Sequence, residues 1–409
     1  MNVDQYQQLL YSYRENPQQA SNIIIEMSKE NMLLFLELNL SLISQSKDTD
    51  LLNFAILLIY RFSKNQLIFK TENCPQIFWP NFTRIIPTVF ESPIFSENSK
   101  NLVSLIISYF ATYFHSIAGD TQIQNFLLEL LRQAPQFETY IITSISEIII
   151  SSQEYGGFSP DILLQFCTMN LQFPNSIIPR LKLYFAFSMR FFTFCDPNDQ
   201  NCIQSKQLLI SLFLELFKQT PEEFLGKFIS TTGLFVESFA VFFEDHIGVF
   251  IPVLCSLASN RNCPFRNEAI FCIESFAVGS INMCSSYETY YQPVLECLLN
   301  IMAEINDQSP LNEEFNDNSS YIIAQHAART FLEECVNLRV YDFLFAYFRK
   351  TIAHFSGGDG SYDKVPWPIM HSFIFALSYQ NFHIPDLIDD DEERISSTSH
   401  RIEFLHSFV

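Results

Sequence analysis

The sequence is poor in positive charge and in the residues that form turns. Its 409 residues include 24 Lys and Arg against 45 Asp and Glu, which gives a formal net charge of −21. Nucleic-acid binders neutralise phosphates with clustered cations, so this deficit predicts no nucleic-acid binding. The 10 Gly and 18 Pro make up about 7% of the chain against a usual value of roughly 12%. So few turn-forming residues disfavour both an all-β chain of many hairpins and a Gly-rich nucleotide-binding fold.

The sequence also lacks an export signal and an uninterrupted membrane-spanning run. Residues Met1–Tyr13 are polar, without the charged and apolar regions of a secretory signal. The apolar stretch Val103–Phe114 is shorter than the roughly 20 residues that cross a bilayer. The longer stretch Phe239–Leu257 carries Glu244, Asp245 and His246 in its middle, where charge is costly in hydrocarbon. We therefore predict no membrane span.

No cysteine or histidine pattern typical of a metal site is present. The ten cysteines contain no C-x-x-C motif and mostly lie in apolar segments, which is typical of buried thiols in a reducing compartment. Cys255, Cys263 and Cys272 would need a fourth ligand and tighter spacing to hold zinc. The sequence predicts no metal and no cofactor.

Catalytic motifs are missing as well. Neither G-x-S-x-G nor H-E-x-x-H occurs. The only tight group of acids and histidine is Glu244-Asp245-His246, whose position at a helix end favours a capping or hydrogen-bonding role. His115, His354 and His371 each lie alone on apolar helices and are interpreted as core or rim residues. We predict that the protein is not an enzyme.

Apolar residues recur at helical spacing along almost the whole chain. Hydrophobic residues make up 48% of the sequence and include 43 Phe, enough to fill a large core. In Asp48–Ser63 the apolar residues form one stripe, with Asp48 or Asp50 as the expected N-cap. Further helices are predicted at 31–46, 76–90, 99–115, 121–132, 137–151, 160–173, 178–194, 204–219, 221–243, 248–258, 265–280, 287–305, 321–336, 340–355 and 367–379. We interpret the Phe-rich helices as core between repeats.

Consecutive predicted helices pair into units of roughly 40 residues, the length of a HEAT-type helical hairpin. The clearest unit is Gly248–Gly279: Pro252 kinks its first helix, Ala269 permits close packing of its second, and Arg266 is placed to tie neighbouring turns together. Such hairpins bury their apolar faces only by stacking. The predicted fold class is all-α, a HEAT-repeat, armadillo-like, right-handed superhelical solenoid of about nine hairpins.

Three parts of the chain, in order, resemble the importin-beta (karyopherin-beta) superfamily. Leu52–Phe62 resembles a helix of the importin N-terminal region, and Gln207–Phe228 followed by Phe250–Ala277 resembles the repeats before the family's acidic loop. Asn306–Asn318 and then Gln325–Leu332 resemble that loop and the small-residue helix after it. The resemblance is greatest to the N-terminal portion of the large members that import ribosomal proteins. Ile59-Tyr60 departs from the family's arginine-rich pattern, and family members are about twice this length.

The resemblance divides the chain into five segments. They are importin N-terminal-like repeats at 1–120, HEAT-like repeats at 121–305, an acidic inter-repeat loop at 306–318, further HEAT-like repeats at 319–385, and an acidic, Ser-rich C-terminal tail at 386–409.

The resemblance also implies a function: a nuclear transport receptor that binds basic protein cargo and a Ran-type GTPase for import, in cytoplasm and nucleus. Basic cargo would carry a nuclear localisation signal or resemble a ribosomal protein, and Phe-Gly nucleoporins are a further implied partner. The implied partner-binding residues, all acidic, are Asp307, Glu313, Glu314 and Asp317 in the loop and Glu268, Glu274, Glu333 and Glu334 on second helices of repeats.

Ordinary structural roles for these acids, and a different function for the chain, remain open as alternatives. The loop acids also fit a solvated insertion, and the helix acids fit an ordinary soluble face. The alternative function is a HEAT-repeat scaffold or adaptor subunit outside nuclear transport, for example in a phosphatase, proteasome or vesicle-coat assembly.

Overall fold

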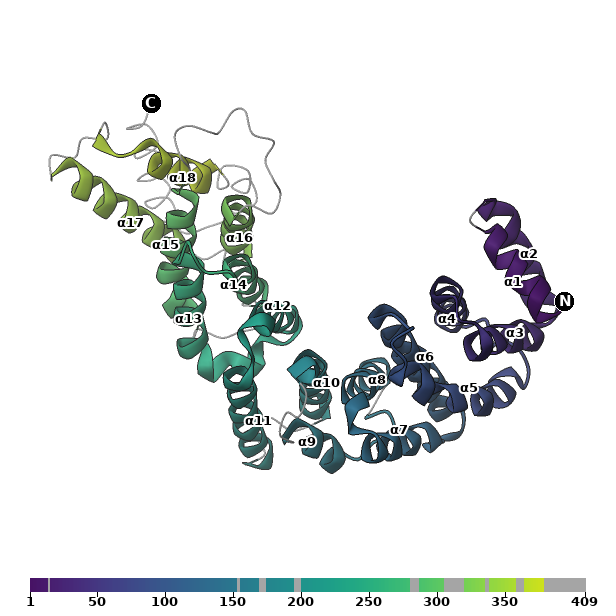
Figure 1. The fold of residues 1–409 in the computed structure, drawn as a ribbon. Helices are drawn as coiled ribbons and strands as arrows, with labels where there is room; N and C mark the ends of the chain where they lie inside the picture. Colours follow the sequence, from purple (N-terminus) through teal and green to yellow (C-terminus); the bar gives the residue numbers. More distant parts are fainter. Residues whose placement is uncertain are drawn as a thin grey trace, which may run out of the picture. The chain divides into compact units, whose positions relative to one another are not determined.

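A computed structural model describes residues 1–13, 15–152, 155–168, 174–194, 200–279, 287–304, 320–334, 338–357 and 364–378 (Figure 1). All regular secondary structure in these residues is helical, as predicted. The α-helices are α1 (Val3–Ser12), α2 (Pro17–Glu30), α3 (Met32–Gln45), α4 (Thr49–Lys64), α5 (Cys74–Glu91), α6 (Glu97–Ala118), α7 (Gln122–Gln133), α8 (Glu138–Ser151), α9 (Pro160–Thr168), α10 (Ile177–Phe194), α11 (Gln200–Gln219), α12 (Glu222–Phe239), α13 (Ile247–Ser259), α14 (Arg266–Gly279), α15 (Tyr291–Met302), α16 (Ser320–Glu334), α17 (Leu338–Ser356) and α18 (Trp367–Ser378).

Local signals in the sequence account for where many helices begin and end. The Asp48 side chain accepts hydrogen bonds from the backbone N–H groups of Asp50 and Leu51, at 2.9 and 3.2 Å, so it is the N-cap of α4 as predicted. Helix α6 ends at Gly119, which adopts φ +64° and donates its N–H to the His115 carbonyl. Glycine adopts this left-handed conformation without steric cost, which is why it ends the helix here.

The structure corrects the predicted helix at 221–243. Helix α12 ends at Phe239, a 3-10 helix spans Ala240–His246, and α13 begins at Ile247. The break buries aromatic rings: the Phe243 ring packs against Phe250 and Phe276, with ring centroids 5.0 and 6.0 Å apart. A continuous helix would carry Phe243 past this cluster, so tertiary packing overrides the helical periodicity. The periodicity also does not single out α1 and α2, whose sequences are rich in Gln and Asn.

The chain forms two compact units, residues 1–231 and 232–409. In the first unit α4, α6, α8 and α10 pack side by side in sequence order, and α3 packs against α5 in a second row. In the second unit α14, α16 and α18 form one row and α13, α15 and α17 the other (Figure 1). Neighbours within a row are therefore two helices apart in sequence, which is the arrangement of stacked helical hairpins.

Polar contacts between neighbouring repeats give the repeat length directly. Hydrogen-bonded partners within a row are 42 residues apart for Glu138 and Arg180 and 38 residues apart for Glu237 and Ser275. The separation rises to 56 residues for Glu274 and Thr330. The increase of 14 to 18 residues is close to the length of the predicted acidic loop 306–318, which lies outside the described residues and stays a prediction.

Phenylalanine fills the core, as predicted. Phe35, Phe82, Phe110, Phe213 and Phe228 are each at most 1% exposed. Their rings pack in tilted, edge-to-face and stacked pairs, such as the tilted pair of Phe213 and Phe228 at 5.4 Å and the stacked pair of Phe78 and Phe82 at 5.4 Å.

Two helical stretches of the described residues, Glu97–Ala118 and Glu222–Ser259, are long and apolar enough to cross a membrane by length and composition. In the structure α6 packs between α4 and α8, and the second stretch consists of α12, a 3-10 helix and α13. The core helix of a soluble protein can pass the same test of length and composition, so the two stretches are weak evidence for a membrane span.

Candidate partner-binding surface

The row of helices α12, α14 and α16 carries a chain of carboxylates bridged by hydroxyl groups. Ser275 of α14 donates a hydrogen bond through its Oγ to Glu237 Oε1 of α12, at 3.1 Å. Thr330 of α16 donates through its Oγ1 to Glu274 Oε1 of α14, at 2.7 Å. Adjacent residues 274 and 275 thus face opposite neighbours, and the acids Glu237 and Glu274 lie in successive repeats.

These carboxylates keep acceptor capacity for a partner. An ionised carboxylate has about four lone-pair sites, and one bridging hydroxyl uses one of them. Glu237 is exposed, while Glu268 and Glu274 are half-buried. Partly exposed, singly bonded carboxylates in a row are suited to receiving lysine or arginine side chains from a basic partner.

Close backbone packing brings α12 against α14 at this row. A Cβ atom added at Gly233 would lie 2.9 Å from a ring carbon of Phe271 and 3.1 Å from Ser275 Oγ. Only glycine permits this approach without displacing Ser275, which is the donor to Glu237. The sequence analysis did not identify Glu237; its only signal is a position 37 residues before Glu274, nearly one repeat length.

Arg266 ties the turn between α13 and α14 to the next repeat, as predicted from the Gly248–Gly279 unit. Its Nε donates to the Ala258 carbonyl at 2.7 Å, and a terminal nitrogen donates to Glu304 Oε1 at 2.8 Å. Ala269, one turn further along α14, is fully buried, in agreement with its predicted packing role. These contacts hold the first turn of α14, and with it Glu268, in a fixed position.

Six of the eight predicted partner-binding residues have no described side chain. Asp307, Glu313, Glu314 and Asp317 lie outside the described residues. Glu333 and Glu334 are at the C-terminal end of α16, and only their backbone is described. The structure therefore places Glu268 and Glu274 on one helix, and partner binding by all eight residues stays a prediction.

In the first unit, the carboxylate that joins two repeats, Glu138, is buried and paired. Glu138 of α8 accepts hydrogen bonds from Arg180 Nε at 2.6 Å and from Ser176 Oγ at 3.1 Å, and the Arg180 terminal nitrogen also contacts it. The side chains of Glu138 and Arg180 are 5% and 3% exposed. This pair joins two repeats and is closed to a partner. The sequence does contain a signal for Arg180 as a residue that joins repeats. The stretch Ile178-Pro179-Arg180 is a weaker copy of the Pro and Arg pattern in Gly248–Gly279.

Cys167 and Cys272 have the environment predicted for inert thiols, whereas the hydrogen bond with Cys255 lowers the pKa of Cys297. Burial raises the pKa of Cys167 to about 12, with Arg180 opposing the shift, and burial followed by the charge of Glu237 raises the pKa of Cys272 to about 12. Thiols with such values stay protonated near neutral pH and are poor nucleophiles.

The histidines lie where the sequence analysis places them. The predicted acid and histidine cluster Glu244-Asp245-His246 does end a 3-10 helix, but His246 makes no side-chain capping bond to α13. His354 is exposed, and His115 and His371 are half-buried. Among the described residues, no three His, Cys, Asp or Glu side chains converge as a metal site would require.

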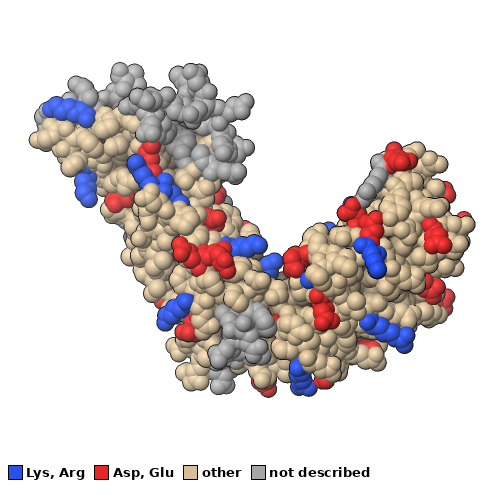
Figure 2. All heavy atoms as spheres, in the orientation of Figure 1, with Lys and Arg blue, Asp and Glu red and all other residues tan. Residues whose placement is uncertain are grey.

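Charged side chains are dispersed over a surface made mainly of other residues (Figure 2). This agrees with the 17% charged residues of the sequence. Local rows of acids, as on α12 and α14, are therefore more informative about a binding surface than the net charge alone.

No protein family profile matches the sequence, and no curated protein matches it. Solved structures do match. The fold is a HEAT-repeat helical solenoid, and the matched structures are karyopherins.

The crystal structure of Kap121p bound to RanGTP matches with TM-score 0.67 and 14% identity, over 96% of this chain and 37% of that one. A structure of Kap95p with RanGDP also matches; in it, Kap95p binding induces the switch loops of RanGDP to adopt the GTP-bound conformation. Its TM-score is 0.70 at 12% identity, over all of this chain and 48% of that one. Kap121p bound to the extreme C-terminus of the phosphatase Cdc14p matches with TM-score 0.65. The chain spans less than half the length of these proteins. At 12–15% identity the likeness establishes the fold alone.

Proposed function

We propose that this protein is a nuclear transport receptor of the importin-beta type that binds basic protein cargo and a Ran-type GTPase. The observation that carries the proposal is the match of 96–100% of the chain to karyopherins solved with Ran. Matched structures also include karyopherins bound to protein ligands, Pho4p and Ulp1p among them. Such a receptor works without catalysis, through binding equilibria that one ligand shifts against another.

The charge of the chain supports a basic partner. A net charge of −21 attracts Lys- and Arg-rich segments and speeds their association in a salt-dependent way. The carboxylates of Glu237 and Glu274 form a local acceptor row on α12 and α14, and Glu268 is a further half-buried acid on α14. Cargo lysines would contact this row together with Glu333 and Glu334 on the neighbouring helix α16. Ribosomal proteins are the cargo class to test first, because their surfaces are strongly basic.

The loop acids are assigned to the GTPase. Asp307, Glu313, Glu314 and Asp317 belong to an insertion that interrupts the 40-residue period, and inserted acidic segments between repeats are free to contact a basic patch on a partner. The assignment is separable from the cargo row, because the two sets of acids do not overlap.

The test is a pull-down of the full chain with a Ran-type GTPase locked in the GTP form and, in parallel, with the GDP form. We expect retention of the GTP form and reduced or no retention of the GDP form. Reversing the four loop acids to lysine should lower GTPase affinity by about tenfold or more, since each rim charge contributes up to about 1 kcal/mol. Reversing four exposed acids of the first unit, Glu26, Glu30, Glu72 and Glu91, is the matched control. Equal loss in both variants would show only a net-charge effect.

A second candidate function is a scaffold subunit outside nuclear transport. The fold itself favours it equally, because stacked hairpins serve many binding roles. Equal or absent binding of the two GTPase forms would favour the scaffold.

The remaining parts of the proposal concern the cellular compartments in which the protein works and its binding to Phe-Gly nucleoporins. A receptor of this kind works in both cytoplasm and nucleus. Val249 and Val253, which are 52% and 44% exposed on α13, provide apolar surface that Phe-Gly nucleoporins could contact. Binding of a Phe-Gly repeat peptide that is lost in a Val249→Asp, Val253→Asp variant would support this part.

A further inference from the structure

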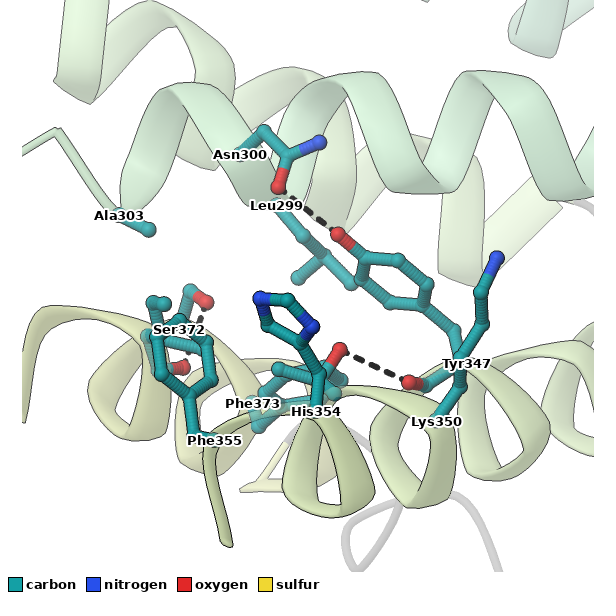
Figure 3. Close-up of a pocket in the computed structure, with 11 residues that line it drawn as sticks. Leu299, Asn300, Ala303, Tyr347, Lys350, His354, Phe355, Ser372 and Phe373 are labelled. Atoms are coloured by element: carbon teal, nitrogen blue, oxygen red, sulfur yellow. Dashed lines mark hydrogen bonds between the residues drawn. The ribbon is translucent and has the colours of Figure 1, made fainter. Parts of the chain in front are cut away.

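The second unit contains a pocket among α15, α17 and α18 that the proposed function does not use (Figure 3). Its volume is about 400 Å³, within the range that ligand side chains fill. Among the residues that the structure describes, none that lines the pocket is Asp or Glu, although the chain as a whole carries a net charge of −21. An acid-free pocket in so acidic a protein points to an acidic ligand.

The floor of the pocket is apolar. Leu299 of α15 and Phe373 of α18 are each 1% exposed, and the half-buried Phe355 and Ile369 line it as well. The Phe373 ring packs against the Tyr347 ring, with centroids 5.7 Å apart. An aliphatic side chain entering here would leave water for an apolar surface that is already in place.

The rim supplies one cation, Lys350, and one imidazole, His354. Tyr347 Oη donates to Asn300 Oδ1 at 2.8 Å, so these two polar groups are paired with each other. The charged or chargeable lining residues are Lys350 and His354, both exposed on α17, and Figure 3 shows His354 directed between α15 and α17. Among the described residues neither forms an ion pair. The fitting ligand is an aliphatic side chain with carboxylates beside it.

One segment of this chain has that chemistry. Residues 386–393, with the sequence Asp-Leu-Ile-Asp-Asp-Asp-Glu-Glu, place Leu387 and Ile388 between carboxylates. Six acids in eight residues repel one another, and contact with cations relieves that repulsion. This acidic segment follows α18, a wall of the pocket, after a connection of only seven residues, 379–385.

The connection is long enough for the acidic segment to return to the pocket. Phe373 and the end of α18 at Ser378 are five residues apart, about 7.5 Å along the helix. Seven extended residues reach up to about 23 Å. A short tether also holds its ligand at an effective concentration of the order of millimolar, so even weak intrinsic affinity fills the site.

We propose that the acidic segment 386–393 occupies the pocket among α15, α17 and α18 of its own chain, with Leu387 or Ile388 on the apolar floor and carboxylates beside Lys350 and His354. The proposal does not rest on the proposed transport function, because it involves neither the GTPase nor cargo.

Photo-cross-linking in the full chain tests the proposal. The variant Ile388→p-benzoylphenylalanine should cross-link within the monomer to peptides of α15, α17 or α18, as identified by mass spectrometry. The same cross-linker at Ile402, beyond the acidic segment, is the control and should give at least fivefold less product at those helices. Lys350→Glu with His354→Glu should reduce the Ile388 cross-link about fivefold or more, because the charge of Lys350 is reversed and a carboxylate replaces the His354 imidazole. Arg349→Glu makes the same change beside Lys350 but outside the lining, and should leave the yield unchanged.

A second measurement avoids the bulky probe. Leu387→Asp with Ile388→Asp should speed amide hydrogen exchange in α17 about fivefold or more relative to the unmodified chain, and leave α4 and α6 unchanged. Equal cross-linking from positions 388 and 402, no effect of reversing Lys350 and His354, or unchanged exchange in α17 would each overturn the proposal. Cross-links that form only between two chains would also overturn it, because they would make a second copy the source of the ligand.

Discussion

The two units of this protein join their repeats with acids of opposite accessibility. In the first unit Glu138 is enclosed, with Arg180 and Ser176 satisfying it at 5% side-chain exposure. In the second unit Glu237 and Glu274 are each bridged by one hydroxyl and stay partly in water. The same residue type therefore serves as an internal lock at Glu138 and as an open acceptor at Glu237 and Glu274, although the second unit also contains an arginine-paired acid, Glu304.

The difference follows from what lies opposite the acid. A guanidinium supplies a fork of donors and permits complete burial of the carboxylate, whereas a serine or threonine hydroxyl supplies one donor and leaves the other lone pairs to solvent. The comparison teaches that an acidic composition is not by itself a binding surface. Acids become available to a partner only where the neighbouring repeat leaves them incompletely satisfied.

The largest effect is expected from breaking the buried Glu138–Arg180 pair of the first unit. Arg180→Met should leave Glu138 as a buried, unpaired charge and destabilise α8 and α10 by about 3–5 kcal/mol. Hydrogen exchange resolved by helix is the measurement, since repeat arrays need not unfold in one step. The double variant Glu138→Met, Arg180→Met should recover most of the loss. A single variant as stable as the unmodified protein would contradict the lock.

The second prediction separates two helices of the open row. Gly233→Val should push α12 from α14, because even a Cβ atom would lie 2.9 Å from Phe271. Overpacking of this kind costs about 1–3 kcal/mol, and it should also weaken the Ser275–Glu237 hydrogen bond. Thermal unfolding and hydrogen exchange of α12 measure the effect. The control is Gly119→Asn, at a helix end where a Cβ atom meets no other atom within 4 Å and Asn tolerates the left-handed conformation.

The third prediction distinguishes charge from structure at the open row. Glu274→Gln keeps a side-chain oxygen to accept from Thr330, so stability should change by less than about 0.5 kcal/mol. Affinity for a basic peptide should fall about twofold to fivefold, as expected for one partly exposed charge. Calorimetric titration at low and high salt measures it, with Glu26→Gln as control. A large stability loss without loss of affinity would make Glu274 a structural residue like Glu138.

The smallest effect concerns alkaline pH in the first unit. Burial, followed by the hydrogen bond to and the charge of Glu97, raises the pKa of Tyr140 well above its ordinary value near 10. The folded chain therefore keeps this proton where the unfolded chain loses it. Stability from Tyr140 is fully present below about pH 10 and declines as the pH rises further. Tyr140→Phe should have a shallower loss of stability between pH 9.5 and 11 than the unmodified protein; parallel curves would contradict the assignment.

Much of the fold could be predicted from the sequence, because it depends on residues that are close to one another along the chain. Helical periodicity, the Asp48 cap and the Arg266 tie all depend on residues close in sequence, and the structure confirms each. The break at Phe239 was not accessible, since it is caused by rings from α13 and α14 that the periodicity cannot place.

The candidate site was less predictable than the fold. Glu274 was identified, but nothing local shows that Thr330, 56 residues away, bridges it, or that Glu237 belongs to the same row. The pocket among α15, α17 and α18 is likewise assembled from residues up to 74 positions apart, Leu299 to Phe373. Such sites depend on the register between repeats, which a single sequence does not specify.

The central claim is that this chain binds basic cargo and that a Ran-type GTPase displaces it. The most direct test is a competition experiment: a fluorescent, Lys- and Arg-rich peptide is bound to the full chain, and the GTPase is titrated in its GTP-locked form and in its GDP form. The account predicts release of the peptide by the GTP-locked form at concentrations at least about tenfold lower than the GDP form requires. Release by both forms at equal concentration, or no release by either, would contradict it.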